Sequence, residues 1–170
     1  MLRRAARIAL GCGQPLLVLG GAQAESVEPC LQGLPLCWHV HRGWADGLGS
    51  SIACAITFVQ QEWPNASGAL LMLADQPRVD LTLLQSLLHI HADHPADIVA
   101  ADYGPRHGPP ALFPRACFAA LSTLRGDRGA QALLLDPPHP MHSVPAPQAA
   151  LDIDLPHDYA QAKHQLEQSD

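Results

Sequence analysis

Short apolar runs alternate along the chain with longer segments in which apolar residues recur at helical spacing. The clearest run lies at residues 70–77, where Leu-Leu-Met-Leu follows Gly68 and Ala69 and precedes Ala-Asp-Gln-Pro. A run bounded by glycine and proline in this way predicts a short strand that is buried on both faces. Pro77 cannot continue a hydrogen-bonded ladder and favours an extended Gln76, so we expect Asp75 at the carboxyl end of this strand.

The same pattern predicts the other elements of the chain. Strands are expected at residues 15–20, 36–40, 97–103, 142–144 and 151–154, with a loop at 104–110 and a short apolar piece at 111–113. Helices are expected at residues 1–10, 24–31, 52–63, 81–91, 115–124 and 130–135, with a last one from residue 156. This alternation predicts an α/β fold, with a mainly parallel sheet between helices on both faces, in a single domain spanning residues 1–170.

A loop rich in glycine and serine, residues 41–51, leads into the third of these helices. Ser50 or Ser51 is expected to cap the helix, and the free N–H groups and positive dipole end there would suit a phosphate. The loop contains no lysine and is therefore not a P-loop. An ordinary capped helix after a tight turn is the alternative interpretation.

Two carboxylates, Asp75 and Asp154, stand at the ends of separate predicted strands. If the strands are parallel, both carboxylates and the glycine–serine loop lie at one edge of the sheet, where ligands bind in open α/β folds. Two aspartates so placed can share one Mg²⁺ that also contacts substrate phosphates. In the alternative interpretation, Asp75 caps the helix that begins near Asp80 and Asp154 caps the last helix beside Pro156.

Composition narrows the class of protein. The 170 residues are 48% hydrophobic and 15% charged, as expected for a globular protein with a core. The net charge is −6 and the ten Lys and Arg residues are scattered, which argues against nucleic acid or an anionic membrane surface as a partner.

The five cysteines are an odd number without metal-type spacing, so we expect reduced thiols in a cytoplasmic protein. The N-terminal residues imitate a signal peptide, but residues 11–15 interrupt the apolar stretch, and we expect this segment to be structural. No apolar run is long enough to span a membrane. The ten histidines form pairs without a third ligand, such as His89 with His91 and His139 with His142, and most are expected at the surface.

Five motifs, in the same order, resemble those of the MobA-like nucleotidyltransferases, and among these the molybdenum-cofactor cytidylyltransferases. They lie at residues 44–52, 73–77, 106–113, 126–130 and 151–159. The resemblance implies a Rossmann-like fold of the nucleotide-diphospho-sugar transferase type and Mg²⁺-dependent transfer of CMP from CTP to molybdopterin. A molybdoenzyme or its chaperone is a further expected partner.

The resemblance also implies roles for particular residues. Asp75 and Asp154 match the positions at the catalytic metal. Loop contacts to the substrates are implied for residues of two motifs: Gly49, Ser50 and Ser51 near the nucleotide, and His107 and Gly108 on the pterin side.

One departure from the family pattern affects both fold and function. The family opens with a strand and the glycine-rich loop Leu-Ala-Ala-Gly-x-Ser-x-Arg-Met-Gly, followed by a lysine; the present sequence begins at the next helix. Because that first strand is central in the family sheet, its two neighbours are expected to lack a hydrogen-bonding partner.

Two accounts follow from this departure. In the first, Met1 is not the true start and a longer parent is active. In the second, the chain is an inactive remnant that binds a pterin cofactor or a protein partner. A guanylyl- or sugar-nucleotidyltransferase relative is a third interpretation.

Overall fold

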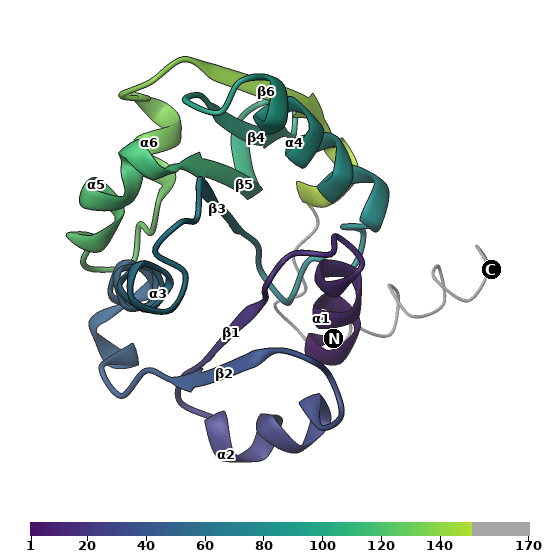
Figure 1. Cartoon of the computed structure of the whole chain (residues 1–170), viewed down its shortest axis with the longest axis vertical. Helices are drawn as coiled ribbons and strands as arrows, with labels where there is room; N and C mark the ends of the chain where they lie inside the picture. The colour runs from purple at the N-terminus through teal and green to yellow at the C-terminus, as the bar shows by residue number, and fades with distance from the viewer. Residues whose placement is uncertain (151–170) are drawn as a thin grey trace.

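A computed structural model describes residues 1–150 of the chain as strands and helices in two connected parts (Figure 1). The strands are β1 (Leu17–Gly20), β2 (Cys37–Val40), β3 (Gly68–Leu71), β4 (Ile98–Asp102), β5 (His107–Pro114) and β6 (Met141–Pro145). The helices are α1 (Leu2–Leu10), α2 (Ala24–Val27), α3 (Leu48–Glu62), α4 (Leu81–Asp93), α5 (Phe118–Ser122) and α6 (Gln131–Leu135). Short 3-10 turns lie at Glu28–Leu31, Trp44–Asp46, Arg115–Cys117 and Pro147–Ala150. The strand predicted at 151–154 and the helix predicted from 156 lie outside the described residues.

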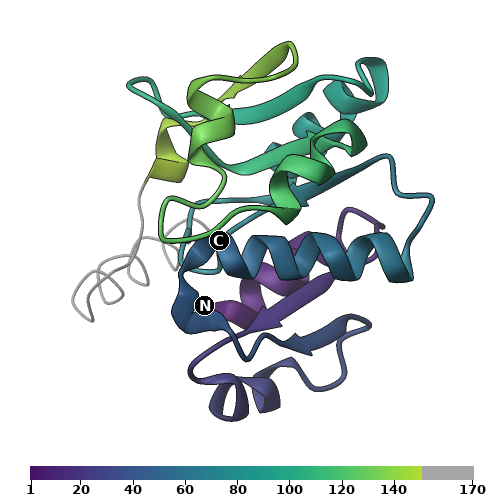
Figure 2. The ribbon, with the colours of Figure 1, turned by 90° about the vertical axis from the view of Figure 1, so that its left-hand side faces the viewer.

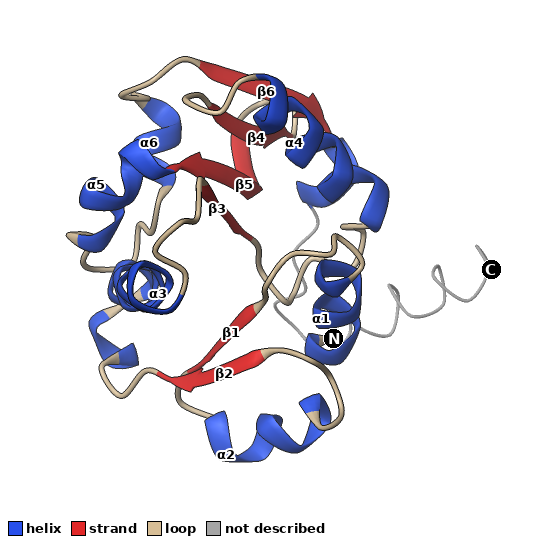
Figure 3. Cartoon of the chain, in the orientation of Figure 1, coloured by secondary structure: helices blue, strands red, loops and turns tan. Residues whose placement is uncertain are grey.

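The strands form two separate sheets rather than one. The strands β1 and β2 pair in parallel, whereas the larger sheet has the order β3-β5-β4-β6. The predicted α/β arrangement with helices on both faces is confirmed: α3, α5 and α6 lie on one side, and α1 and α4 on the other (Figure 3). The larger sheet is mixed, because β5 runs antiparallel to both β3 and β4 while β4 and β6 are parallel.

The strand β5 corrects the sequence analysis, which expected a loop at residues 104–110. Its register with β4 shifts from Ala100 opposite Ala111 to Ala101 opposite Gly108. The shift leaves Pro109 and Pro110 without partners on β4, as in a β-bulge. Proline is tolerated in a sheet at such a bulge, where no ladder hydrogen bond from its nitrogen is needed.

The strand β3 also differs from its prediction. It ends at Leu71, so Asp75 lies in the following loop and not at the carboxyl end of the strand. All four residues of β3 are half-buried, whereas the apolar run predicted burial on both faces. The reason is that β3 is an edge strand, paired only with β5 in the part of the chain that the structure describes.

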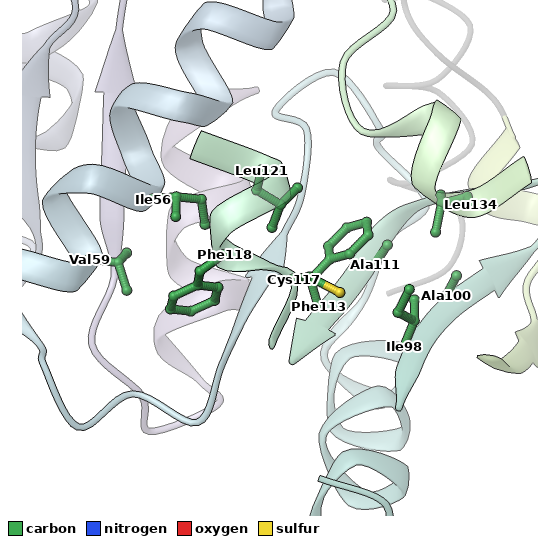
Figure 4. Close-up of a cluster of buried hydrophobic side chains, with 10 residues drawn as sticks. All are labelled: Ile56, Val59, Ile98, Ala100, Ala111, Phe113, Cys117, Phe118, Leu121 and Leu134. Carbon is green, nitrogen blue, oxygen red and sulfur yellow. The ribbon is translucent and has the colours of Figure 1, made fainter. Parts of the chain in front are cut away.

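Two apolar clusters cover the two faces of the larger sheet. One joins Ile98, Ala100 and Phe113 to residues of α3, α5 and α6, as Figure 4 shows. The other joins Val99 and Ala101 to α4. Successive residues of β4 therefore point to opposite helical layers, as the period of a strand requires.

The helix α4 begins as predicted, with Asp80 as its N-cap. Asp80 Oδ1 accepts a hydrogen bond of 2.8 Å from the backbone N–H of Leu83. We expect Asp80→Ala to lower the free energy of unfolding by about 1 kcal/mol, measured by urea denaturation. Asp93→Ala, at the exposed last turn of the same helix, is the matched control and should change stability by less than about 0.5 kcal/mol.

Within residues 1–150, no helix is long and apolar enough to cross a membrane.

Candidate functional site

A cavity of about 1090 Å³ lies between β1 and β3. Residues of α3 line one side of it, and residues of α1 and α4 line the other. Figure 2 shows α3 running alongside both parts of the molecule. The cavity therefore separates the two sheets.

Four of the motifs singled out in the sequence contribute residues to the lining of this cavity. These residues are Ser51, Gln76, Arg106, His107, Gly108, Asp127 and Arg128. Ser51 lies in the first turn of α3, and Gln76 follows β3. Of the features expected at one edge of the sheet, the glycine–serine loop contributes Ser51 to the cavity, and the loop that carries Asp75 contributes Ala74 and Gln76.

Two backbone hydrogen bonds join the glycine–serine loop to the turn at Gly126. Gly49 N donates to Gly126 O at 2.8 Å, and Gly126 N donates to Asp46 O at 3.1 Å. Gly47 has a φ of +90°, and a Cβ there would lie 2.5 Å from the carbonyl carbon of Gly126. Only glycine fits this position, because it needs both a positive φ and a close approach of two backbones.

The predicted serine cap of α3 is wrong. The helix begins at Leu48 with Gly47 as its N-cap and no side-chain cap. The close packing of Gly47 against Gly126 sets this earlier start. Ser50 instead binds within the loop: its Oγ donates toward Gly47 O at 2.8 Å and lies 3.1 Å from His41 Nε2. Of the three loop residues assigned to the nucleotide, Ser51 lines the cavity, whereas Gly49 and Ser50 hold the loop in shape.

His107 and Gly108 are positioned by Tyr103. The backbone N–H of Tyr103 donates to Arg106 O at 3.0 Å, closing the turn between β4 and β5. Gly108 packs on the ring of Tyr103, where a Cβ would lie 2.5 Å from Cε2. The hydroxyl of Tyr103 donates to Pro109 O.

The same tyrosine ties this turn to the loop that carries Asp75. Gln76 Nε2 donates to Tyr103 Oη at 2.8 Å and to Ala149 O at 2.9 Å. Asp75 is half-buried, and its two neighbours, Ala74 and Gln76, line the cavity. The loop that carries Asp75 is therefore joined to the turn between β4 and β5 through the side chains of Gln76 and Tyr103. Asp154, the expected second carboxylate, lies outside the described residues.

Four polar motif residues line the cavity although the sequence analysis assigned them no role: Gln76, Arg106, Asp127 and Arg128. Both arginines lie inside motifs that can be recognised in the sequence. A basic residue within such a motif was the signal that could have marked them as candidates for phosphate binding. Gln76 could not be found in this way, because its contacts to Tyr103 and Ala149 join residues 27 and 73 positions apart. Its Oε1 is buried and has no hydrogen-bond partner among residues 1–150.

His91 lines the cavity from α4 and is only 8% exposed. Its Nε2 lies 3.4 Å from Ser67 Oγ, and burial lowers its pKa below the ordinary value of 6.5. The unfolded chain therefore binds more protons than the folded protein at and below pH 6.5, so the free energy of unfolding should fall as the pH is lowered from 7 to 5. Urea denaturation across this range should show a weaker pH dependence for His91→Gln. His89→Gln, on the exposed side of α4, should keep the wild-type slope.

The histidine pairs considered in the sequence are not the ones that meet. His142 Nε2 lies 2.9 Å from Asp97 Oδ2, and its ring stacks on that of His94 with centroids 4.3 Å apart. This group stands at the amino ends of β4 and β6, and none of its members lines the cavity.

All five cysteines are free thiols. Burial raises the pKa of three of them, Cys12, Cys54 and Cys117. A raised thiol pKa disfavours the thiolate, so these three are poor candidates for a nucleophile.

An α/β arrangement with helices on both faces of its sheets belongs to the Rossmann-like class. Within this class, the chain belongs to the MobA-like NTP transferase domain family, whose model matches residues 1–142. It is therefore a nucleotidyltransferase-type domain.

Solved structures of similar fold agree with this assignment. Rv0371c from Mycobacterium tuberculosis H37Rv is 26% identical with a TM-score of 0.78, over 95% of this chain and 82% of that one. A structure of Rv0371c in complex with manganese is 25% identical with a TM-score of 0.77, over 95% and 85% of the two chains. A nucleotidyl transferase from Methanothermobacter thermautotroptrophicus has a TM-score of 0.79 over 100% of this chain and 82% of that one; at 17% identity this likeness shows the fold alone.

A curated relative is also similar in sequence. The purine catabolism protein PucB of Bacillus subtilis (strain 168) is 29% identical over 96 residues. The match takes in 56% of this chain and 44% of PucB, so the chain spans less than half the length of this relative.

Proposed function

We propose that this protein transfers CMP from CTP to the terminal phosphate of molybdopterin. An oxygen of that phosphate would attack the α-phosphorus of CTP, forming a new P–O–P bond. The bond between the α- and β-phosphates would break, and pyrophosphate would leave. The observation that carries the proposal is the gathering of four family motifs around one cavity in a MobA-like domain.

The chain's own residues offer what phosphoryl chemistry needs most, which is positioning and charge neutralisation. Arg106 and Arg128 bring two cations to the cavity. Ser51 adds a hydroxyl in the first turn of α3, where the helix dipole favours an anion. The buried Oε1 of Gln76 is an acceptor that an amino group of the pterin or the cytosine would satisfy.

The carboxylate of Asp75 suits a hard divalent cation, since magnesium prefers oxygen ligands and keeps several of its waters. We propose that Asp75 and Asp154 hold Mg²⁺ together. When bound, the ion would neutralise phosphate charge and align the reacting oxygens. Manganese in the structure of Rv0371c supports a divalent-metal site in a similar protein.

His107 and Gly108 are the residues that we propose for the pterin side of the site. The packing of Gly108 on Tyr103 holds their backbone in place, so the turn is formed before a ligand arrives. A molybdoenzyme or its chaperone would receive the product. We place this activity in the cytoplasm, where the five free cysteines would stay reduced.

A second candidate function is a binding protein without turnover. The feature that favours it is the cavity between β1 and β3, whose volume of about 1090 Å³ can hold a ligand between the two sheets. Such a protein would bind a pterin or a protein partner through the same loops.

The discriminating experiment is a pyrophosphate-release assay with Mg²⁺, molybdopterin and either CTP or GTP. Release with CTP that depends on the acceptor is the expected result. Release mainly with GTP would move the assignment to a guanylyltransferase. Pterin binding with no release from either nucleotide would identify the non-catalytic binding protein.

A further inference from the structure

A group of possible metal ligands lies outside the cavity, at the amino ends of β4 and β6. It consists of His94, Asp97 and His142, whose ligand atoms all lie within 4.8 Å of one another. His142 Nε2 is 2.9 Å and His94 Nδ1 is 3.8 Å from the same oxygen, Oδ2 of Asp97. The sequence shows only histidine pairs without a third ligand, whereas the fold brings a carboxylate to two histidines that are 48 positions apart.

The backbone around all three residues is held by regular structure. His94 is the C-cap of α4, where its N–H donates to Ile90 O at 2.9 Å. A turn with Pro95 as its second residue joins His94 to Asp97, and Asp97 N donates to His94 O at 3.1 Å. His142 lies on β6, which pairs in parallel with β4, and Figure 1 shows α4, β4 and β6 beside one another. The positions of the three side chains are therefore set before any ion binds.

The three side chains are partly exposed to solvent, in a graded way. The exposed fraction is 18% for Asp97, 35% for His142 and 51% for His94. An ion could therefore enter from the solvent side, and protein would surround it on the other side. Without an ion, the same contacts form a hydrogen-bonded pair of His142 and Asp97 with the ring of His94 stacked on it.

The types of ligand atom indicate which ions would fit. Two imidazole nitrogens and one carboxylate oxygen suit Zn²⁺ and other first-row transition metals, whereas Mg²⁺ and Ca²⁺ prefer oxygen ligands. Bonds of about 2.0–2.2 Å place the ligand atoms of a tetrahedral zinc centre about 3.3–3.5 Å apart. The distances of 2.9 Å and 3.8 Å to Asp97 Oδ2 lie on either side of this range, so rotation of the side chains is enough to form the centre.

We propose that His94, Asp97 and His142 bind a transition-metal dication of the zinc type, with water in the remaining coordination position. Such an ion would join the end of α4 to the starts of β4 and β6. The proposal is independent of the nucleotide chemistry, because none of the three residues lines the cavity. The five residues of β4 separate Asp97 from the turn that carries His107, which is roughly 16 Å at about 3.3 Å per residue.

The experiment titrates the full chain, without an added affinity tag, with Zn²⁺ by calorimetry and with Co²⁺ by visible absorption. The wild type should bind one ion per chain, and Co²⁺ should give the intense d–d absorption of a four-coordinate centre. In NMR spectra, Zn²⁺ should shift the ring resonances of His94 and His142 and leave those of His89 unchanged. Zn²⁺ should also raise the midpoint of thermal unfolding, because it binds the folded state.

Three variants test the ligands one at a time. His94→Gln, Asp97→Asn and His142→Gln should each weaken Zn²⁺ binding at least about tenfold, since even the loss of an outer-shell partner typically has that effect. His89→Gln is the matched control, because His89 and Asp93 form an exposed pair 3.8 Å apart that has no third ligand among residues 1–150. His94 is the most exposed of the three ligands, so His94→Gln still tests the site if Asp97→Asn fails to melt cooperatively.

The variant Asp75→Asn separates this site from the proposed magnesium site. It should bind Zn²⁺ as the wild type does, and His94→Gln should bind Mn²⁺–CTP as the wild type does. Four results would overturn the proposal. They are Zn²⁺ that neither shifts the two histidine rings nor raises the midpoint, wild-type Zn²⁺ affinity in His94→Gln or His142→Gln, an equal loss in His89→Gln, and loss of Zn²⁺ binding in Asp75→Asn.

Discussion

Replacing Phe113 with alanine is expected to lower the free energy of unfolding by about 3–5 kcal/mol. The Phe113 side chain is fully buried, on a strand that pairs with both β3 and β4. It belongs to the cluster in which Phe118 and Leu121 of α5 and Ile56 of α3 cover one face of the sheet (Figure 4). The substitution removes the buried apolar surface of the phenyl ring together with its packing contacts. The surrounding helices can move inward to fill only part of the space that is left.

Urea denaturation followed by circular dichroism measures this change directly. Phe58→Ala is the matched control, because Phe58 is half-buried and its ring lies tilted against His39 and edge-on to Trp63. Phe58→Ala should lower the free energy of unfolding clearly less than Phe113→Ala does. Equal losses for the two variants would mean that the cluster around β5 is not the main stabilising core.

Much of the fold can be read from local features of the sequence. The N-cap at Asp80 and the apolar spacing after it predict α4, and the structure places the helix start there. The capping interaction joins residues three positions apart, so the sequence contains all the information that it requires. The strands β1 and β4 are likewise recognisable as short apolar runs that end near a glycine.

The wrong predictions share a physical cause, which is that tertiary contacts decided the outcome. The start of α3 depends on the approach of Gly47 to Gly126, 79 positions later in the chain. The strand character of residues 107–110 depends on a bulge in the pairing with β4. Local propensity contains no information about these distant contacts. It favours a serine cap at the start of α3 and a proline-rich loop at residues 107–110.

At the candidate site, too, some features follow from the local sequence and others depend on tertiary contacts. The motifs can be recognised in the sequence, and residues from four of them line the cavity. The network from Gln76 through Tyr103 to Pro109 is what connects two of these loops, and it consists of side-chain and backbone contacts between distant residues. It makes the position of Asp75 depend on the β4–β5 turn. Substitutions at Tyr103 should therefore disturb both loops together.

Replacing Asp75 with asparagine is expected to lower the transfer rate, as kcat/KM, on the order of 100-fold or more. Asparagine has nearly the same shape but lacks the negative charge that would hold a divalent cation, so the loss should come from metal and phosphate binding rather than from the fold. Mn²⁺ titration by calorimetry, with and without CTP, provides a readout that does not depend on turnover. The variant should bind Mn²⁺–CTP at least about tenfold more weakly.

Asp136→Asn is the control, because it makes the same change in charge at an exposed position just after α6. It should leave Mn²⁺–CTP binding unchanged. If Asp75→Asn melts cooperatively at the wild-type temperature and still binds Mn²⁺–CTP with wild-type affinity, Asp75 does not hold the metal and the proposed site is wrong. If neither the wild type nor the variant binds Mn²⁺–CTP while both bind the pterin, the loops around Asp75 and His107 serve a binding protein without turnover. The melt separates these outcomes from simple unfolding, since a ligand that binds only the native state must raise the midpoint.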